Sequence, residues 1–529
     1  MGRSMNARLH RPARAARGLG GVVAAAAVLL AGCAGLPSQE GRPESFVLQD
    51  TAGTRLAAAI DPLAAVHPGK SGIYPLVLAT DAFAARVLLA SAAERSIDAQ
   101  YYIWHPDQTG MLLLESLWNA AGRGVRVRIL LDDQNTRGFD DMLAALGARR
   151  NFEVRLYNPF ATRGARFLSY LNEFERVNRR MHNKAFIADN RLAIVGGRNI
   201  GNEYFGAGSE IPFKDLDVLV AGAAVPEVSA EFDRYWNSAS AYPVRRLLGE
   251  APPDAVQRLE ERFAAARADP ESKKYLDAVR GTELLGRILE RRLDIEWAGA
   301  RLVADDPAKT LEPEPSEGQL LLGELLEGTG PRRSFDLVSP YFVPGEKGTA
   351  ALEALARRGV RVRVLTNSLA ATDVAIVHSG YAKRRCGLAR AGVILYEMKP
   401  QVAADGTKEK RKAAASGSSA ARLHAKTFAA DGERIFVGSF NFDLRSALLN
   451  TEMGLVIESP PLAGRLGAMF DEIVPPNAYE VRALEAEPCL EWIERTPTGE
   501  VRHRTEPESS AVRRAWLEFL EMLPIDWLL

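Results

Sequence analysis

The sequence predicts an α/β protein made of two similar halves in tandem. The run Gly124-Val-Arg-Val-Arg-Ile-Leu130 recurs 235 residues later as Gly359-Val-Arg-Val-Arg-Val-Leu365. Each copy follows a segment with helical spacing of apolar residues, and each copy itself has the pattern of a buried strand. Short apolar strands that alternate with amphipathic helices favour a mostly parallel or mixed sheet covered on both faces. Each half is therefore expected to be an α/β sandwich.

Length and composition exclude several other classes. A chain of 529 residues with 47% apolar and 25% charged residues is too long for one ordinary domain and has enough apolar residues for packed cores. Basic and acidic residues number 67 each, but residues 1–32 hold five arginines and no acid. Without these five, 62 basic and 67 acidic residues leave a net charge of −5. Such a surface gives no overall electrostatic argument for a nucleic-acid partner.

Residues 1–32 have the layout of a secretory signal peptide. Arginines come first, an apolar run follows from Leu19 to Leu30, and small residues follow that run. The end of the run, Leu-Ala-Gly-Cys33, resembles a bacterial lipobox, so Cys33 is the expected lipidation site. We therefore expect a membrane-anchored lipoprotein that faces the periplasm, and Ala34 after the cysteine favours the outer membrane. A plain signal peptide or an uncleaved anchor is the alternative.

The rest of the chain is expected to have five parts. The repeat and the changes in composition predict a lipid-anchored tether at 33–70, a first half at 71–245, a helical connector at 246–325, a second half at 326–460 and a C-terminal extension at 461–529.

Three shorter features have two interpretations each. Residues 401–420 are of low complexity and form either a solvated surface loop or part of the mouth of a site. The C-terminal run 516–529 is apolar at helical spacing, and it either packs on the core or contacts a membrane. Cys386 and Cys489 either pair in an oxidising periplasm or remain free thiols.

A duplicated motif, His-x-Lys-x-x-x-x-Asp, carries the candidate chemistry. A histidine and a lysine two residues apart on a strand project from the same face, so that an imidazole and an ammonium converge on one anion. In both copies an apolar strand and a glycine turn follow, and the turn can return an asparagine amide to the same point. The matching residues are His182 and His424, Lys184 and Lys426, Asp189 and Asp431, and Asn199 and Asn441.

Two such sets suit substitution at phosphorus. That reaction needs positive charge around the oxyanions, a nucleophile on one side and a proton donor in line on the other. A single His-x-Lys is most often ordinary packing, whereas a duplicated pattern of this length indicates a site. Since no thiols or carboxylates cluster in metal-ligand spacing, we expect no metal and no other cofactor.

The duplicated motif resembles the phospholipase D superfamily, and the resemblance runs from about Ser71 to Ile457. Other segments are similar to bacterial cardiolipin synthases of the C type, which lack N-terminal transmembrane helices; these segments are 71–76, 99–104, 196–205 and 450–454. The resemblance implies two pseudo-symmetric phospholipase D-like halves. It also implies a covalent phosphohistidine, in which one histidine attacks the phosphodiester, the other protonates the leaving alkoxide, and an alcohol or water then displaces the histidine.

The resemblance also implies a role for each motif residue. His182 is the nucleophile and His424 the general acid, although pseudo-symmetry makes the two chemically alike. The phosphoryl oxygens are held by Lys184, Lys426, Asn199 and Asn441.

Carboxylates before the next strand of each half have an expected role as well. Asp215 and Glu452 are expected to orient the histidine of the opposite half, with Asp217 as the rival to Asp215, whereas Asp189 and Asp431 are expected to be structural. The phosphate-binding set includes Ser439 and its first-half counterpart Gly197, where one hydroxyl ligand is missing.

The leading function is that of a phosphatidyltransferase forming cardiolipin from two phospholipids at a membrane surface. A phospholipase D-type phosphodiesterase that hydrolyses phospholipids is the alternative, because water and a lipid alcohol differ only in what enters after phosphohistidine forms. The net charge and the export signal disfavour a periplasmic nuclease, and two complete motifs disfavour a protein that only binds lipid. The expected partners are phospholipids; an accessory protein stays open. Some aromatic residues beside the motifs are expected to line an apolar mouth: Tyr101, Tyr102, Trp104, Tyr204, Phe205, Tyr341, Phe342, Phe440 and Phe442.

Overall fold

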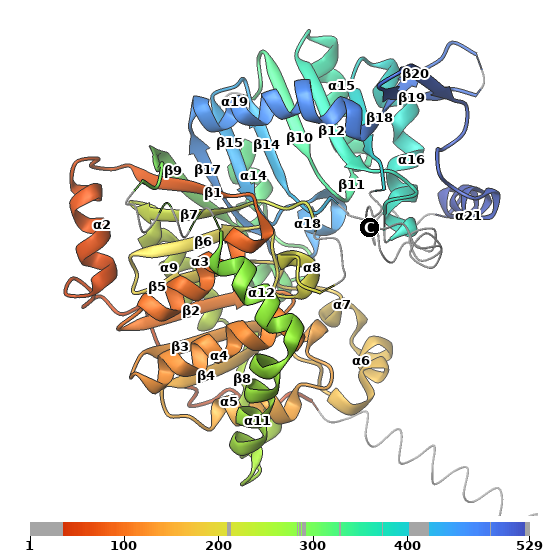
Figure 1. Cartoon of the computed structure of the whole chain (residues 1–529). Coiled ribbons are helices and arrows are strands. Elements are labelled where there is room, and N and C mark those ends of the chain that lie inside the picture. The colour runs from red at the N-terminus through yellow and green to blue at the C-terminus, as the bar shows by residue number, and fades with distance from the viewer. Residues whose placement is uncertain are drawn as a thin grey trace, which may run out of the picture.

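The computed structural model describes residues 35–523 apart from 209–212, 283, 285–286, 288–291, 327–329, 373, 401–422 and 487. The predicted signal peptide, Cys33, the 401–420 segment and the last six residues of the C-terminal run therefore lie outside the described residues. Within the described part, one mixed sheet passes through both halves, and helices pack on both of its faces (Figure 1).

The first half contributes eight strands in the described part of the chain. β2, β3 and β4 are parallel to one another, and the other neighbours pair antiparallel. Their order across the sheet is β8 (Ala241–Pro243), β4 (Phe152–Tyr157), β3 (Arg126–Asp132), β2 (Ser96–Tyr101), β5 (Ala185–Ala188), β6 (Leu192–Gly196), β7 (Asp217–Gly222) and β1 (Ser71–Leu76).

The second half repeats this order. β10, β12 and β13 are the parallel strands, and they correspond to β2, β3 and β4. The order is β17 (Met453–Glu458), β15 (Arg434–Gly438), β14 (Thr427–Ala430), β10 (Ser334–Val338), β12 (Arg361–Asn367), β13 (Ile394–Met398), β18 (Ala478–Ala483), β19 (Leu490–Thr496) and β20 (Gly499–His503). A short parallel pair, β11 (Phe342–Val343) and β16 (Phe442–Asp443), lies apart from this sheet. The predicted α/β fold with two similar halves is confirmed.

Strand β9 (Glu296–Ala304) joins the two halves. It pairs antiparallel with β1 on one edge and with β17 on the other. The helical connector predicted at 246–325 therefore contains a strand as well as helices, and its described helices include α10 (Val244–Leu248), α11 (Ala255–Ala268), α12 (Pro270–Arg280) and α14 (Leu321–Leu326). The strand is stabilised by pairing on both edges, which its own sequence does not reveal.

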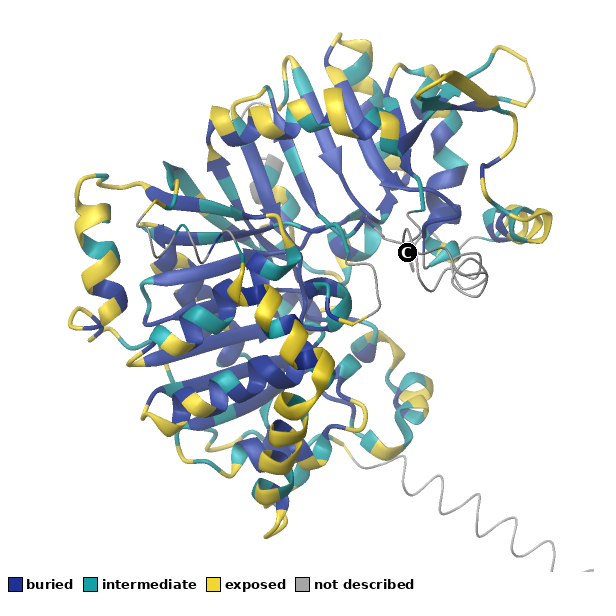
Figure 2. Cartoon of the chain, in the orientation of Figure 1, coloured by how far each residue is buried: buried dark blue, intermediate teal, exposed yellow. Residues whose placement is uncertain are grey.

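Helices cover the sheet in the same way in both halves. α3 (Ala79–Ala92), α4 (Gln108–Gly122) and α12 pack on one face of the first half, and α9 (Val225–Trp236) packs on the other (Figure 1). In the second half, α15 (Gly345–Arg357) and α16 (Ala375–Arg390) cover one face and α19 (Pro460–Ala468) the other. The core around α9 and α19 is continuous between the halves, and the strands are the most deeply buried part of the chain (Figure 2).

Eight further helices belong to the described part of the chain. They are α2 (Arg55–Ala65), α5 (Asp140–Gly147), α6 (Arg166–Asn172), α7 (Phe174–Val177), α8 (Asn202–Phe205), α18 (Leu444–Leu448), α20 (Val474–Asn477) and α21 (Ala511–Glu521). Among the described residues, no helix is both long enough and apolar enough to pass through a bilayer.

The segment predicted as a tether packs on the first half, and its hydrogen bonds to the globule begin at Ser38. The Arg42 guanidinium donates to the carbonyl oxygens of Ser238 and Ala241, at 2.6 Å each, and the Val47 amide donates to Asp233 at 2.7 Å. Its prolines suggested an extended linker. Hydrogen bonds to the end of α9 hold it against the globule instead.

The C-terminal extension completes the second half. Strand β18 pairs with β13, and a disulfide joins Cys386 on α16 to Cys489 before β19, with Cα atoms 6.3 Å apart. This contact answers the question of whether the two cysteines pair. Leu517 and Leu520 of α21 are buried, while Trp516 is exposed, so this helix packs on the core with one face.

Candidate active site

The two histidine motifs meet where the halves join. Each motif runs beside the acidic segment of the other half: Met181 forms a β-bridge with Thr451, and Leu423 forms one with Lys214. The His182 amide donates to the Thr451 carbonyl at 2.8 Å, and the His424 amide donates to the Lys214 carbonyl at 2.8 Å. The backbone therefore sets each histidine against a carboxylate that comes from the opposite half.

A polar residue at the end of a parallel strand holds each motif in place. Asp132 ends β3 and accepts a hydrogen bond from the Met181 amide at 2.8 Å. Asn367 ends β12, and its Oδ1 accepts from the Leu423 amide at 3.1 Å. These two residues are the last of the two repeated strands, so their position at the carboxyl edge of a parallel sheet was the signal by which sequence reasoning could have found them.

The histidines pair crosswise with the two acids. His182 Nδ1 lies 2.8 Å from Glu452 Oε2, and His424 Nδ1 lies 2.5 Å from Asp215 Oδ2. Asp217, the rival, forms an ion pair with Arg86 at 2.9 Å instead of reaching a histidine. A carboxylate at Nδ1 fixes the tautomer of an imidazole and leaves its Nε2 directed toward a substrate.

Glu452 is fully buried in a set of hydroxyl donors. Ser439 Oγ donates to its Oε2 at 2.5 Å, and Ser446 Oγ donates to its Oε1 at 2.7 Å. The Glu452 amide donates to Asp305 Oδ2 at 2.8 Å. Burial raises the pKa of Glu452 to about 7, although Lys184 and the two hydroxyls oppose this shift. The hydroxyl of Ser439, expected to bind phosphate, thus contacts the carboxylate.

Asp215 occupies a different environment. A Cβ atom at Gly197 would come within 2.2 Å of Asp215 Oδ1, so only glycine leaves room for this carboxylate. Burial alone would raise the pKa of Asp215, but His424 and Lys426 hold it well below its usual range. The missing hydroxyl of the first half therefore has a steric reason: the shorter acid lies where the serine would be.

The lysines and asparagines of the motifs are also buried. Lys184 Nζ donates to the His182 carbonyl at 2.5 Å, and Lys426 Nζ donates to the His424 carbonyl at 2.6 Å. Burial lowers the pKa of Lys184 to about 7. Asn199 is engaged, since its Oδ1 accepts from Ile103 N and its Nδ2 donates to Tyr204 Oη, both at 3.1 Å. The Oδ1 of Asn441 is buried with no hydrogen-bond partner among the described residues.

Aromatic rings flank both histidines. The Tyr102 ring lies edge-on to His182 with centroids 5.1 Å apart. His424 lies between Tyr204, at 5.2 Å, and Phe213, which stacks on it at 5.4 Å. Burial and the charge of Lys184 lower the pKa of His182 well below its usual value, and burial and Lys426 lower that of His424. Phe213 was missed from the sequence, as were Asp305 and Ser446, because none belongs to the repeated motif.

The motif aspartates lie away from this cluster. Asp189 accepts hydrogen bonds from the backbone amides of residues 94–96, and Asp431 accepts from those of residues 332–334. Both acids therefore tie the turn after a motif strand to the start of the neighbouring parallel strand. Across the residues that the structure describes, no group of three or more His, Cys, Asp or Glu side chains could hold a metal ion.

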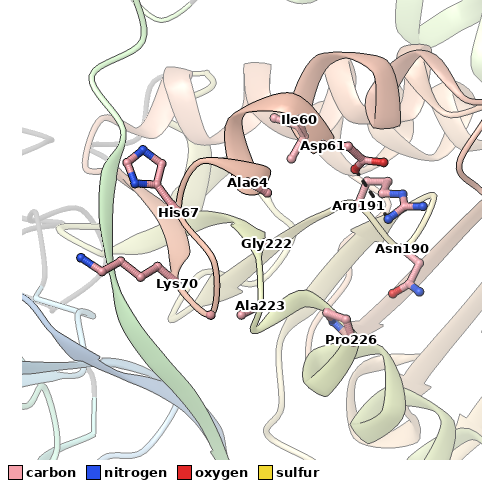
Figure 3. A pocket seen from close by; sticks show the side chains of 11 residues that line it. Ile60, Asp61, Ala64, His67, Lys70, Asn190, Arg191, Gly222, Ala223 and Pro226 are labelled. Carbon is pink, nitrogen blue, oxygen red and sulfur yellow. Dashed lines mark ion pairs between the residues drawn. The ribbon is translucent and has the colours of Figure 1, made fainter.

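A separate cavity of about 230 Å³ lies against α2, at the end of β5 that is farther from the histidine motif (Figure 3). His67, Lys70 and Arg191 are among its lining residues. Its basic groups are partly engaged, because Arg191 pairs with Asp61 at 3.6 Å and the His67 ring stacks on Trp297 at 4.6 Å. It holds none of the paired histidines and acids described above.

The fold and the duplicated motif are those of the phospholipase D-like class. The chain belongs to the family described as "Cardiolipin synthase, PLD-like domain", which matches residues 87–236 and 329–474. It is 44% identical over 476 residues to cardiolipin synthase C of Escherichia coli strain K12, covering 90% of this chain and 100% of that protein. It is 28% identical over 376 residues to cardiolipin synthase A of Pseudomonas putida, covering 69% of this chain and 61% of that protein.

Among solved structures, the phosphatidylserine synthase of Haemophilus influenzae matches with a TM-score of 0.50 and 13% identity, covering 77% of this chain and 87% of that chain. This likeness concerns the fold alone. The family resemblance predicted from the motifs is confirmed by these comparisons.

Proposed function

We propose that this protein is a phosphatidyltransferase that forms cardiolipin from two phospholipids through a phosphohistidine. The observation that carries the proposal is the crosswise arrangement, in which each buried histidine contacts a carboxylate of the opposite half through Nδ1. Two histidines held in this way, with two buried lysines beside them, provide a nucleophile, an acid and positive charge for one phosphodiester.

His182 is the nucleophile in this proposal. Its lowered pKa favours the neutral imidazole, which is the form that attacks phosphorus. His424 is the general acid, because the ionised Asp215 beside it opposes the lowering of the His424 pKa by burial and Lys426 and so stabilises an imidazolium. Lys184, Lys426 and the amide of Asn441 bind the phosphoryl oxygens.

The reaction takes place in two displacements. In the first, His182 Nε2 attacks phosphorus, the bond from phosphorus to the leaving alcohol oxygen breaks, and that oxygen takes a proton from His424. In the second, the hydroxyl of the acceptor lipid gives its proton to His424 and attacks phosphorus, and the bond to His182 breaks. Both histidines return to their starting protonation states, so no cofactor is consumed.

The periplasmic, lipid-anchored location is part of the proposal. The disulfide between Cys386 and Cys489 supports an oxidising compartment. A lipid on Cys33 would hold the site at its substrates, with the outer membrane preferred. Replacing Cys33 by serine is expected to abolish labelling by a palmitate analogue; unchanged labelling would mean that Cys33 is not the acylated residue.

The decisive test uses purified protein and vesicles of phosphatidylglycerol, with the lipid products identified by mass spectrometry. Cardiolipin and free glycerol are expected, and the His182→Ala protein is the control. Added short alcohols are expected to divert the phosphatidyl group into the matching esters. If phosphatidic acid is the only product at every lipid density, the protein is a phospholipase and the transferase proposal is wrong.

A further inference from the structure

A large apolar cavity lies between α19 and the sheet, next to the candidate active site. Its volume is about 580 Å³, which is within the size range of small-molecule and lipid sites. Apolar side chains from both halves make up most of its wall, including Val218, Leu365, Met398, Val437, Leu462 and Leu466.

The cavity adjoins His424. Phe213 and Asp215 both line it, and these two residues also stack on and pair with the imidazole. Ala425 lines the cavity, whereas its neighbour Lys426 belongs to the reaction site. Successive residues of an extended segment point to opposite sides, so this segment is the wall between the cavity and the reacting groups.

The mouth of the cavity is apolar and exposed. Val77, Leu78 and Ile473 belong to its lining, and their exposed fractions are 63%, 56% and 57%. Large apolar side chains at such exposure in one place indicate contact with another apolar surface. Val77 and Leu78 directly precede α3, and Ile473 ends the segment after α19, so the mouth lies between the two halves.

Two cations complete the lining. The side chains of Lys214 and Arg465 form no ion pair or hydrogen bond with any residue that the structure describes. Burial lowers the pKa of Lys214, which an anion beside it would counteract. Among the lining residues that the structure describes, Asp215 is the only carboxylate, and it is engaged with His424. An apolar cavity with two cations that have no partner in the described part of the chain matches a molecule with an anionic head and an apolar tail.

We infer that this cavity holds one acyl chain of an anionic phospholipid, and that Lys214 and Arg465 bind the phosphate of that lipid. The inference rests on the proposed function, which it extends from the reacting groups to the lipid tail. The exposed apolar mouth brings the cavity against the lipid surface, so that a chain enters without crossing water.

Binding tests the inference without turnover. The His182→Ala protein is titrated with palmitoyl-lysophosphatidylglycerol, palmitoyl-lysophosphatidylcholine and glycerol phosphate, each below the concentration at which micelles form. Saturable binding is expected, tightest for the lipid with the net negative head and absent for glycerol phosphate. Arg465→Glu is expected to weaken binding about fivefold. Lys70→Glu, in the cavity of Figure 3, is the matched control and leaves binding unchanged. If the His182→Ala protein binds the lysolipids equally tightly with and without Arg465→Glu, the assignment of the lipid phosphate to Lys214 and Arg465 is wrong.

Chain-length preference tests the apolar part. Leu466→Trp fills the cavity, and the ratio of kcat/KM for long-chain over short-chain phosphatidylglycerol is expected to fall about tenfold. Ala92→Phe, which lines a different apolar cavity of about 280 Å³, keeps the parent ratio. If the Leu466→Trp protein is active and its ratio is unchanged, the acyl-chain site is wrong and the proposed function still stands. Should the Leu466→Trp protein not fold, Leu462→Phe, which fills the same cavity by a smaller volume, is measured in its place, and the ratio is again expected to fall. If the parent protein transfers neither lipid, the proposed function itself is wrong, and the lysolipid titration still decides the cavity.

Discussion

The two halves share strand order and motif but support their histidines differently. The first half supplies the shorter acid, Asp215, next to Gly197, and the second supplies the longer acid, Glu452, hydrogen-bonded by Ser439. The pKa of Asp215 lies well below its usual range, whereas that of Glu452 is raised to about 7. The pKa values of the two acids are shifted in opposite directions, so the two chemically similar histidines have different partners. A pseudo-symmetric fold can therefore assign one histidine to attack and the other to proton transfer.

Removing either histidine is expected to have the largest effect. General acid catalysis is typically worth about 10²–10⁴ in rate, so His424→Ala should lose about that much, and His182→Ala should lose more because it removes the nucleophile. Turnover of phosphatidylglycerol by each variant measures the loss, and circular dichroism checks the fold.

A substrate with a good leaving group distinguishes the two roles. A nitrophenyl phosphodiester needs little protonation of its leaving oxygen, so the first displacement, measured as a burst of nitrophenolate, should recover in His424→Ala and not in His182→Ala. Rescue of His182→Ala instead would reverse the assignment. Near-normal rates in either variant with both substrates would remove the two-histidine mechanism.

Neutralising the two acids should have unequal effects. Asp215→Asn removes the charge that stabilises the imidazolium of His424, and we expect a loss of about 10³ in kcat. Glu452→Gln should cost less, about 10–100-fold, since the pKa of this acid is already about 7 and its charge is only partly present at neutral pH. Equal losses in the two variants would show that the difference in pKa does not matter for catalysis.

Replacing Gly197 by the serine found in the second half tests why the two halves use acids of different length. Gly197→Ser places a Cβ within 2.2 Å of the present position of Asp215 Oδ1, so the carboxylate must move and kcat should fall about 10²-fold. Adding Asp215→Glu reproduces the pair found in the second half and should recover part of this loss. A double variant slower than Gly197→Ser would mean that the backbone, not the length of the acid, sets the difference.

The rate should depend on pH on both sides of neutrality. Glu452 has a pKa of about 7, so it becomes protonated as the pH falls, stops accepting from His182 Nδ1, and the rate declines. Lys184 also has a pKa of about 7, so it loses its charge as the pH rises, and the rate declines again. The profile of kcat is therefore expected to be bell-shaped, with limbs that belong to this coupled pair. Glu452→Gln should flatten the acid limb; an unchanged limb would assign it to another group.

Sequence reasoning went furthest where the chain repeats itself. The duplicated strands and motifs allowed the two halves and the crosswise acids to be predicted, because matching segments must occupy matching places. It went less far where only one half holds a feature. Asp305 and Phe213 come from segments without a counterpart in the motif, and strand β9 exists through pairing with both halves. The contrast of Gly197 with Ser439 was visible in the sequence, but its steric cause needed coordinates.

The smallest expected effect on activity concerns a covalent link that, in the described part of the chain, only the second half has. The disulfide joins α16 to the extension that carries β18 and β19, across 103 residues of sequence. Cys386→Ser with Cys489→Ser should lower the free energy of unfolding by about 2–4 kcal/mol, because the unfolded chain gains freedom when the loop is opened. Chemical denaturation of the oxidised parent and the double variant measures this change. Reduction of the parent is the matched control and should give the same shift. Activity at low temperature should stay at the parent level, since both cysteines pack against an apolar cluster of the second half that includes none of the paired histidines and acids. An unchanged midpoint would contradict the disulfide, and a selective loss of activity with full stability would mean that the extension positions the site.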